Sequence, residues 1–248
     1  MKVKELQISG LSSRIYEPEN EIKELMLAIH GFAGDKESSV VVAVAEMLTK
    51  HKIATISYDL PNHGGNVKST PLSLEECIES VCDMLTYAKK EYEGLPISIF
   101  ATSFGGFLIL QHLKRYDEDF KNVILRSPAI DMANILVKNI LPEHKLTIKD
   151  FTNPQNLGYG YELWIDKKFI DDLYKNNLEG GINKTDNHFH IMQGLQDDIV
   201  DPNFVFDYAN KHFNNSHTLH IFENADHRYK KPGELERIVD ITQKIFKK

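Results

Sequence analysis

Residues 95–106 read LPISIFATSFGG, in which an apolar run leads directly into a turn that contains Ser103. The run predicts a buried strand, and the residues from Gly105 to about Arg115 predict a helix. Small residues, Ala101 and Gly105, stand two places before and after the serine. A tight bend between strand and helix needs small neighbours, and it lifts a serine hydroxyl above the sheet. The first N–H groups of the helix favour negative charge there. Ser103 is therefore a candidate nucleophile, although serine is also common as a plain helix N-cap.

The same rhythm of strand and helix extends in both directions from this turn. A polar hairpin at 2–8 and 13–16 opens the chain, and a capping box, Ser73 with Glu76, starts the clearest helix. The remaining predicted strands cover 25–29, 53–58, 97–101, 123–125, 189–192 and 219–222, and the remaining predicted helices cover about 40–50, 105–115, 202–213 and 234–246. Continuous apolar strands that alternate with helices predict an α/β fold, with a mostly parallel sheet covered on both faces. Such sheets carry their chemistry at the carboxyl ends of the strands.

The rhythm is lost between about residues 131 and 187. This stretch mixes short apolar pieces with prolines, glycines and several aromatic side chains, and it contains the single tryptophan, Trp164. It is too short for an obvious second core and too aromatic for a linker. We therefore expect one α/β domain over residues 1–248, with a small cap inserted at about 131–187. Ordinary surface helices are the alternative for this stretch.

Composition narrows the range of partners. The formal charge of −7, from 29 Lys and Arg against 36 Asp and Glu, provides no basic face for nucleic acid. Neither a secretory leader nor a run of about 18 apolar residues is recognisable, so we expect a cytoplasmic protein that does not bind membranes. Cys77 and Cys82 lie in one amphipathic stretch, at a spacing that suits neither a metal site nor a structural disulfide. His188 and His190 lack a third ligand at metal-binding spacing, so no metal is expected.

Two further strand ends supply the groups that a nucleophilic serine needs. Asp197 follows one of the last two predicted strands, and His227 follows the other. The chain order Ser103, Asp197, His227 matches one of the convergent hydrolase arrangements and not the other two. These three residues form the candidate catalytic set.

Other residues compete for the roles of acid and base. Asp198 adjoins Asp197 and is the alternative acid, whereas Asp226 is interpreted as a loop-bracing carboxylate. His30 and His63 also sit at strand ends and are conceivable bases. Both lie in glycine-containing loops, where a structural hydrogen bond is the favoured interpretation.

Four motifs together form a recognisable set. They are the loop His30-Gly31-Phe32, the pattern Asp59-x-x-x-His63-Gly64, the turn around Ser103, and the paired loops Gly194-x-x-Asp197 and Ala225-Asp226-His227. With them the sequence resembles α/β-hydrolases of the single-domain esterase, lipase and serine-aminopeptidase branch. The short chain, the His-Gly-Phe-x-Gly loop and the insertion after the sixth strand are similar to bacterial cinnamoyl (feruloyl) esterases. The resemblance covers nearly the whole chain apart from the insertion.

The resemblance implies a role for each matching residue. Ser103 matches the nucleophile, His227 the general base and Asp197 the acid. The backbone N–H groups of Phe32 and Phe104 match the two donors of the oxyanion hole. The family's reaction involves no metal or cofactor.

The chain departs from the family pattern at three places. Ala101-Thr102 stands where Gly-His is common, and Asp201 stands where many relatives have proline. Phe104 replaces a more usual polar residue, and we expect its side chain to narrow the acyl pocket. None of these changes removes a group with a catalytic role.

The predicted function is hydrolysis of carboxylic esters of small or medium size, including aryl or hydroxycinnamoyl esters. The partner is a small-molecule substrate, and the chain is a monomer or a homodimer. A thioesterase or acyltransferase would use the same residues, and an aminopeptidase-like enzyme would need acidic groups for the substrate amine, with Glu162 and Asp166 as candidates. A noncatalytic ligand-binding member of the fold is a further alternative. Dehalogenases and epoxide hydrolases of this fold use aspartate at the position of Ser103, so they are disfavoured.

Overall fold

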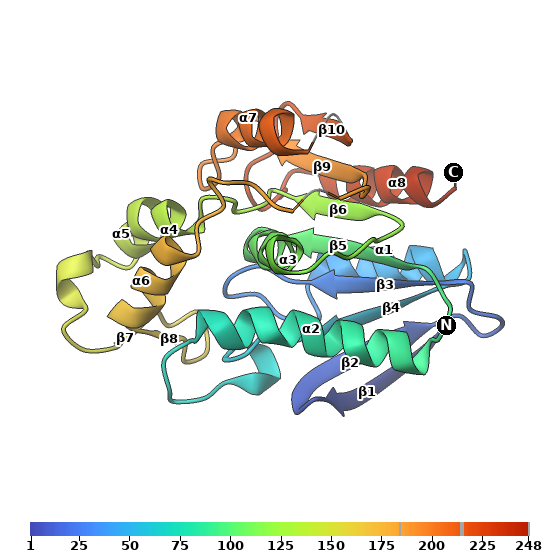
Figure 1. Cartoon of the computed structure of the whole chain (residues 1–248), viewed down its shortest axis with the longest axis horizontal. Coiled ribbons are helices and arrows are strands. Elements are labelled where there is room, and N and C mark those ends of the chain that lie inside the picture. Colours follow the sequence, from blue (N-terminus) through green and yellow to red (C-terminus); the bar gives the residue numbers. More distant parts are fainter. Residues whose placement is uncertain (184, 214–215, 248) are drawn as a thin grey trace.

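An eight-stranded sheet forms the centre of the molecule within the residues that the structure describes (Figure 1). The structure, a computed structural model, describes residues 1–183, 185–213 and 216–247; Lys184, Asn214, Asn215 and Lys248 lie outside the described residues. The strands are β1 (Lys2–Ile8), β2 (Leu11–Glu17), β3 (Glu24–Ile29), β4 (Ile53–Tyr58), β5 (Ile97–Thr102), β6 (Val123–Arg126), β9 (Phe189–Gly194) and β10 (His217–Phe222). Their order is β1-β2-β4-β3-β5-β6-β9-β10. β1 pairs antiparallel with β2 and β2 antiparallel with β4, and the other pairings are parallel.

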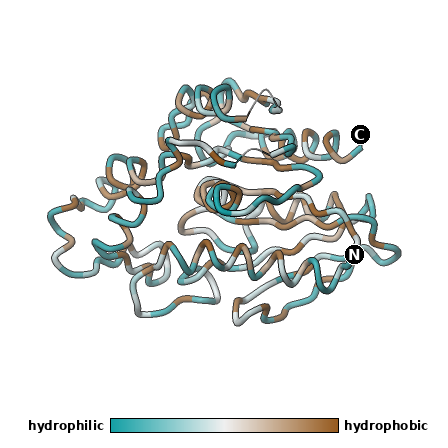
Figure 2. Tube along the Cα trace, in the orientation of Figure 1, coloured by the Kyte–Doolittle hydropathy of each residue, from teal (hydrophilic) through white to brown (hydrophobic). Residues whose placement is uncertain are grey.

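Helices cover both faces of this sheet (Figure 1). One apolar core contains buried residues of α2 (Leu74–Glu91), α3 (Phe104–Arg115) and α7 (Pro202–His212), and a second contains those of α1 (Ser39–Thr49) and α8 (Glu234–Phe246). The side chains of β3 point alternately into the two cores. The first core contains Leu25, Leu27 and Ile29, and the second contains Met26 and Ala28. Figure 2 shows hydrophobic residues along the central strands and alternating hydropathy along the covering helices. The predicted α/β class with a mostly parallel sheet is confirmed.

The capping signal at the start of α2 is present in the structure. The Ser73 side chain accepts a hydrogen bond from the Glu76 N–H at 3.3 Å. The predicted apolar face of this helix is buried, as Cys77 and Val81 illustrate. Cys77 and Cys82 are both free thiols, the first buried and the second partly exposed.

Short elements fill the chain between β6 and β9, beside the carboxyl ends of the parallel strands (Figure 1). They are α4 (Met132–Ile135), the π-helical turn η2 (Leu136–Ile140), α5 (Leu141–Glu143), the 3-10 turn η3 (Ile148–Asp150), β7 (Gln155–Asn156), β8 (Trp164–Ile165) and α6 (Lys167–Lys175); a further 3-10 turn, η1 (Gly64–Asn66), follows β4. α6 begins where the Asp166 side chain accepts the Phe169 N–H at 2.8 Å. The apolar face of α6, including Phe169 and Leu173, joins the core formed by α2 and α3. This segment therefore has no separate core among its described residues.

Candidate active site

Ser103 occupies a strained turn between β5 and α3. Its backbone adopts φ 49° and ψ −112°, a region that residues with side chains rarely enter and that persists only where the surroundings enforce it. Two backbone hydrogen bonds hold the turn: the Ser103 N–H donates to Arg126 O at 2.9 Å, and the Ala129 N–H donates to Ser103 O at 3.0 Å. Ser103 also lines the cavity described below. The turn thus presents the hydroxyl to a cavity at the carboxyl ends of the parallel strands.

Gly105 allows α3 to begin against the end of β3. A Cβ atom at this position would lie 2.5 Å from Ile29 O and 2.6 Å from His30 O, which is closer than atoms can pack. A Cβ atom on Gly31 would lie 3.2 Å from the Cβ of Ser103. The loop after β3 is therefore in direct contact with the serine turn, and the glycine predicted at position 105 avoids backbone atoms at the end of β3 and the start of that loop.

His227 joins the serine to a carboxylate. Its Nε2 lies 3.1 Å from Ser103 Oγ, and its Nδ1 lies 2.9 Å from Asp197 Oδ2 and 3.1 Å from Asp197 Oδ1. With the Nδ1–H donating to the carboxylate, Nε2 is left to accept the proton of the serine hydroxyl. The structure thus brings together the three residues that the strand ends predicted, from loops that follow β5, β9 and β10.

Hydrogen bonds stabilise the Asp197 carboxylate in its charged form. Burial acts to raise its pKa, but hydrogen bonding to His227 and to the Val200 N–H outweighs burial, and the pKa lies below its ordinary value. The Val200 and Ile199 N–H groups donate to Oδ1 at 2.8 and 3.1 Å, and the Gln193 side chain donates to Oδ2 at 3.1 Å. An ionised, fully bonded carboxylate fixes the orientation of the imidazole.

Two backbone N–H groups beside Ser103 are unused. Within the described residues, neither the Phe32 N–H nor the Phe104 N–H has a hydrogen-bond partner. Phe104 is the first residue of α3, so its N–H has no partner inside the helix, and the first helical bond runs from Phe107 N–H to Ser103 O at 3.2 Å. The two N–H groups come from the loop and the helix that meet at the serine, which is where an oxyanion would form.

A buried ion pair braces the loop that carries Phe32. Asp59, at the end of β4, accepts the Lys36 N–H at 2.8 Å, the Gly65 N–H at 2.8 Å and the Lys36 ammonium at 3.1 Å. Burial opposes ionisation of Asp59, but these three bonds lower its pKa below the ordinary value. Asp59 therefore fixes the far end of the loop, a role that its motif alone did not reveal.

His30 and His63 are engaged in loop hydrogen bonds. The Nδ1–H of His30 donates to Gly31 O at 2.7 Å, and its Nε2 accepts the Leu60 N–H at 3.0 Å. The Nδ1–H of His63 donates to Pro61 O at 2.8 Å. Burial lowers the pKa of both histidines, that of His63 to about 3. The structural interpretation of both residues agrees with these contacts.

Asp198 and Asp226 lie apart from the hydrogen-bonded set. The Asp198 side chain is exposed and does not contact His227. The Asp226 carboxylate accepts the Arg228 N–H at 2.9 Å and the Lys230 N–H at 3.4 Å, so it braces the loop as expected.

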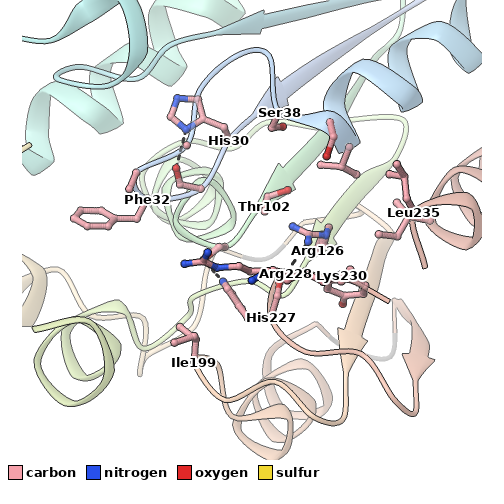
Figure 3. A pocket seen from close by; sticks show the side chains of 18 of the residues that line it. His30, Phe32, Ser38, Thr102, Arg126, Ile199, His227, Arg228, Lys230 and Leu235 are labelled. Atoms are coloured by element: carbon pink, nitrogen blue, oxygen red, sulfur yellow. Dashed lines mark hydrogen bonds between the residues drawn. The ribbon is translucent and has the colours of Figure 1, made fainter. Parts of the chain in front are cut away.

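Ser103 and His227 line a cavity of about 710 Å³, and Figure 3 shows His227 among other residues of its walls. One side is lined by residues of the segment between β6 and β9, which are Met132, Ile135, Ile140, Glu143 and Tyr159. The opposite side is lined by the first residues of α1 and by residues at and before the start of α8. A substrate whose carbonyl lies at Ser103 could thus extend from it in two directions, with the acyl group on one side and the alcohol group on the other.

Three sequence-based expectations about the walls of this cavity are wrong. Phe104 is 0% exposed and is not part of the cavity lining, because its ring packs in the core against Phe32, Phe107 and Phe169; Phe32 lines the cavity instead. Glu162 accepts the Trp164 indole N–H at 3.1 Å, and Asp166 caps α6, so neither carboxylate lines the cavity.

Sequence reasoning missed Arg126, which lines the cavity beside Thr102 (Figure 3). The predicted strand ended one residue earlier, whereas β6 continues to Arg126 in register with Thr102 of β5. A single arginine matches no motif, and only its place at the carboxyl end of a buried strand could have drawn attention to it.

Two kinds of site are not found in the part of the chain that the structure describes. No group of three or more His, Cys, Asp or Glu side chains there is arranged to hold a metal ion. No described helix combines the length and apolar character needed to cross a bilayer.

Comparisons with known proteins agree with this geometry. A family model described as "Serine aminopeptidase, S33" matches residues 20–155. Est1E from Butyrivibrio proteoclasticus, solved with ferulic acid bound, is similar in structure with TM-score 0.77 and 19% identity, over 99% of this chain and 100% of that one. The mouse α/β hydrolase domain-containing protein 10 gives TM-score 0.76 and 16% identity, over 100% and 99%. A soluble variant of the Saccharomyces cerevisiae monoglyceride lipase gives 0.73 and 15%, over 99% and 95%. No curated protein matches this chain in sequence.

Proposed function

Because the chain belongs to the serine aminopeptidase (S33) family of the α/β-hydrolase fold, we propose that it is a serine hydrolase that cleaves carboxylic esters. In this proposal Ser103 is the nucleophile, His227 the general base and Asp197 the residue that orients it. The observation that carries the proposal is the continuous hydrogen-bonded path from Asp197 through His227 to Ser103, which ends at a cavity.

The reaction follows from the positions of these groups. Nε2 of His227 takes the proton of Ser103 as Oγ attacks the ester carbonyl, and Asp197 stabilises the imidazolium that forms. The free N–H groups of Phe32 and Phe104 receive the oxyanion, where one such donor contributes about 10²- to 10³-fold in rate. His227 then returns the proton to the leaving alcohol, and water attacks the acyl-enzyme with the same histidine as base. All the groups named in this mechanism come from one chain.

The walls of the cavity support substrates of small or medium size. Residues about 131–187 act as a cap in this proposal, since the side chains that it places over Ser103 include Met132, Ile135 and Tyr159. Apolar and aromatic walls suit an aryl or hydroxycinnamoyl group. The ferulic acid bound to the similar Est1E supports the same choice of substrate.

The charges around the cavity favour an ester over a peptide with a free amino terminus. Arg126, Arg228, Lys230 and Lys231 line it, and they outnumber the lining carboxylates of Glu143 and Glu236. A protonated substrate amine would be repelled by this excess of cations. A thioester would meet the same groups as an oxyester and is included in the test.

The test is a panel of chromogenic esters of graded chain length together with methyl ferulate, a matched acyl thioester and an amino-acid anilide. We expect ester hydrolysis that is abolished in Ser103→Ala and retained in Ser69→Ala, a control at an exposed loop serine. A fluorophosphonate should label wild type and Ser69→Ala but not Ser103→Ala. Absence of both turnover and labelling in the folded wild type would overturn the assignment, and faster turnover of the thioester or anilide would replace the ester preference.

A further inference from the structure

A buried arginine lies at the edge of the reacting site without an acidic partner. Arg126 is 8% exposed, and among the described residues no carboxylate forms an ion pair with it within 4.0 Å. Burial lowers the pKa of Arg126, and the acidic groups that act against burial, such as Asp197 and Glu234, are not in contact with the guanidinium. A desolvated charge of this kind is ordinarily paired.

The hydrogen-bonding capacity of Arg126 is largely unused. Its Nη2 donates to His227 O at 3.4 Å, and its Cζ lies 4.4 Å from the centre of the Tyr229 ring. Its Nε is buried without a partner, and Nη1 also has none in the described part of the chain. A guanidinium has five N–H groups, and donors buried without acceptors are rare in folded proteins because they are costly. The ring and the carbonyl thus hold the guanidinium in place while leaving it able to bind an acceptor that the chain does not supply.

The start of α1 adds a second positive feature to the same cavity. Ser38, Ser39 and Val40 line it, and in the view of Figure 3 Thr102 lies between Ser38 and Arg126. The first turn of α1 contains no acidic residue, and the Ser38 side chain makes no capping hydrogen bond. The first helical bond runs from the Val42 N–H to Ser38 O, and the Ser38 N–H donates to Asp35 O. Among the described residues the N–H groups of Ser39, Val40 and Val41 have no hydrogen-bond partner, and the start of a helix favours an anion.

The rim of this side of the cavity is also basic. Arg228, Lys230 and Lys231 are exposed there, whereas Glu236 is the lining carboxylate on α8. The rim attracts anions over a longer range, and salt screens it. Arg126 differs from the rim because it is enclosed and fixed.

We propose that the part of the cavity between Arg126 and the start of α1 binds a carboxylate of the substrate, so that the preferred esters carry a second, anionic group. This inference rests on the proposed hydrolase function and deepens it. The guanidinium and the N–H groups of α1 pair with the distal carboxylate while the ester carbonyl lies at Ser103. The anionic group takes no part in bond breaking; it fixes the ester relative to the nucleophile.

The first experiment uses wild-type protein and two pairs of matched esters. One pair is the para-nitrophenyl half-ester of glutaric acid and its neutral analogue with isopropyl in place of the carboxylate. The other is para-acetoxybenzoate and para-isopropylphenyl acetate, which carry the group on the alcohol side. Each kcat/KM is divided by the alkaline hydrolysis rate of the same ester. We expect a preference of about tenfold to hundredfold for the anionic member of at least one pair, the range of a charge-assisted hydrogen bond. No preference in either pair overturns the proposal.

Variants then separate Arg126 from the general positive field. Arg126→Gln should remove the preference through a higher KM for the anionic ester, and Arg126→Lys should restore part of it. Lys90→Gln, an exposed control on α2 and outside the cap, should leave the preference intact. The preference should also survive added sodium chloride. An equal loss of kcat on both esters of a pair would assign Arg126 only to support of the His227 loop and would refute carboxylate binding.

A binding measurement does not depend on hydrolysis. Glutarate should raise the melting temperature of Ser103→Ala at constant ionic strength, and it should not do so in the double variant Ser103→Ala/Arg126→Gln. A shift without any ester turnover in wild type would contradict the proposed function but support the carboxylate site. Ester turnover without a shift in melting temperature and without a preference for anionic esters would support the proposed function and contradict the carboxylate site.

Discussion

Replacement of Gly105 by alanine tests how closely the serine turn and the loop after β3 must approach each other. The added Cβ atom would lie 2.5 Å from Ile29 O, whereas ordinary contact begins at 3.4 Å. Ile29 O is a backbone atom and cannot rotate away as the end of a side chain could. It would therefore have to move by about 0.9 Å, which is 3.4 Å minus 2.5 Å. His30 O, at 2.6 Å, must move as well, and His30 precedes by two residues the Phe32 N–H that is proposed to bind the oxyanion.

The expected magnitudes follow from this displacement. Overpacking costs about 1–3 kcal/mol, and the better helix propensity of alanine offsets at most about 1 kcal/mol of it. In a chain of this size each kcal/mol lowers the melting temperature by about 2–4 °C. A shift approaching 1 Å in a catalytic group costs about 10²-fold in rate, so the folded Gly105→Ala variant should lose about that factor in kcat.

The assay combines thermal unfolding with initial rates on a neutral chromogenic ester. Gly180→Ala is the matched control, because a Cβ atom there meets nothing within 4 Å and the change should be neutral or slightly stabilising. If Gly105→Ala retained wild-type kcat and melting temperature, the close approach of helix and loop would not matter for the site, and the steric argument would be refuted.

Two further predictions concern carboxylates. Asp197→Asn should lower kcat by about 10⁴-fold, because the amide favours the wrong imidazole tautomer, whereas Asp198→Asn should leave kcat unchanged; similar losses in both variants, measured with one ester, would contradict the assignment. The pKa of Asp59 is lowered in the folded protein, so its stabilisation is complete above its unfolded value and disappears as pH falls through the folded value. Urea unfolding should therefore show Asp59→Asn to be less stable than wild type near pH 7, with the difference shrinking in acid, and a difference independent of pH would exclude this ion pair as its source.

The sequence predicts the sheet and its covering helices well, because apolar runs and helical periodicity depend on local residues. α8 spans Glu234–Phe246 as predicted. β5 and β6 run one residue further than predicted, to Thr102 and Arg126, since the ladder continues into polar residues where hydropathy gives no signal.

In the candidate site, residues that belong to local motifs could be predicted, whereas residues brought together by packing could not. Ser103, Asp197 and His227 could be predicted because each follows a recognisable strand in a short motif. The side chains that complete the cavity could not, since they depend on packing between distant segments. From the sequence we expect the bulky ring of Phe104 in the pocket, but in the structure the ring packs in the core against Phe107 and Phe169. Arg126 becomes notable only when the structure shows that no carboxylate of the described residues forms an ion pair with it.

Because β10 lies at the edge of the sheet, the catalytic site can be lost by local opening while the rest of the fold remains intact. β10 pairs with β9 alone among the described strands, and most of its residues are not fully buried. Ser103 follows a central strand, but His227 follows β10. Edge elements with few neighbours open more readily than central ones. Detachment of one peripheral strand would remove the histidine from an otherwise intact molecule, so the durability of the chemistry depends on how well the last strand and α8 stay attached.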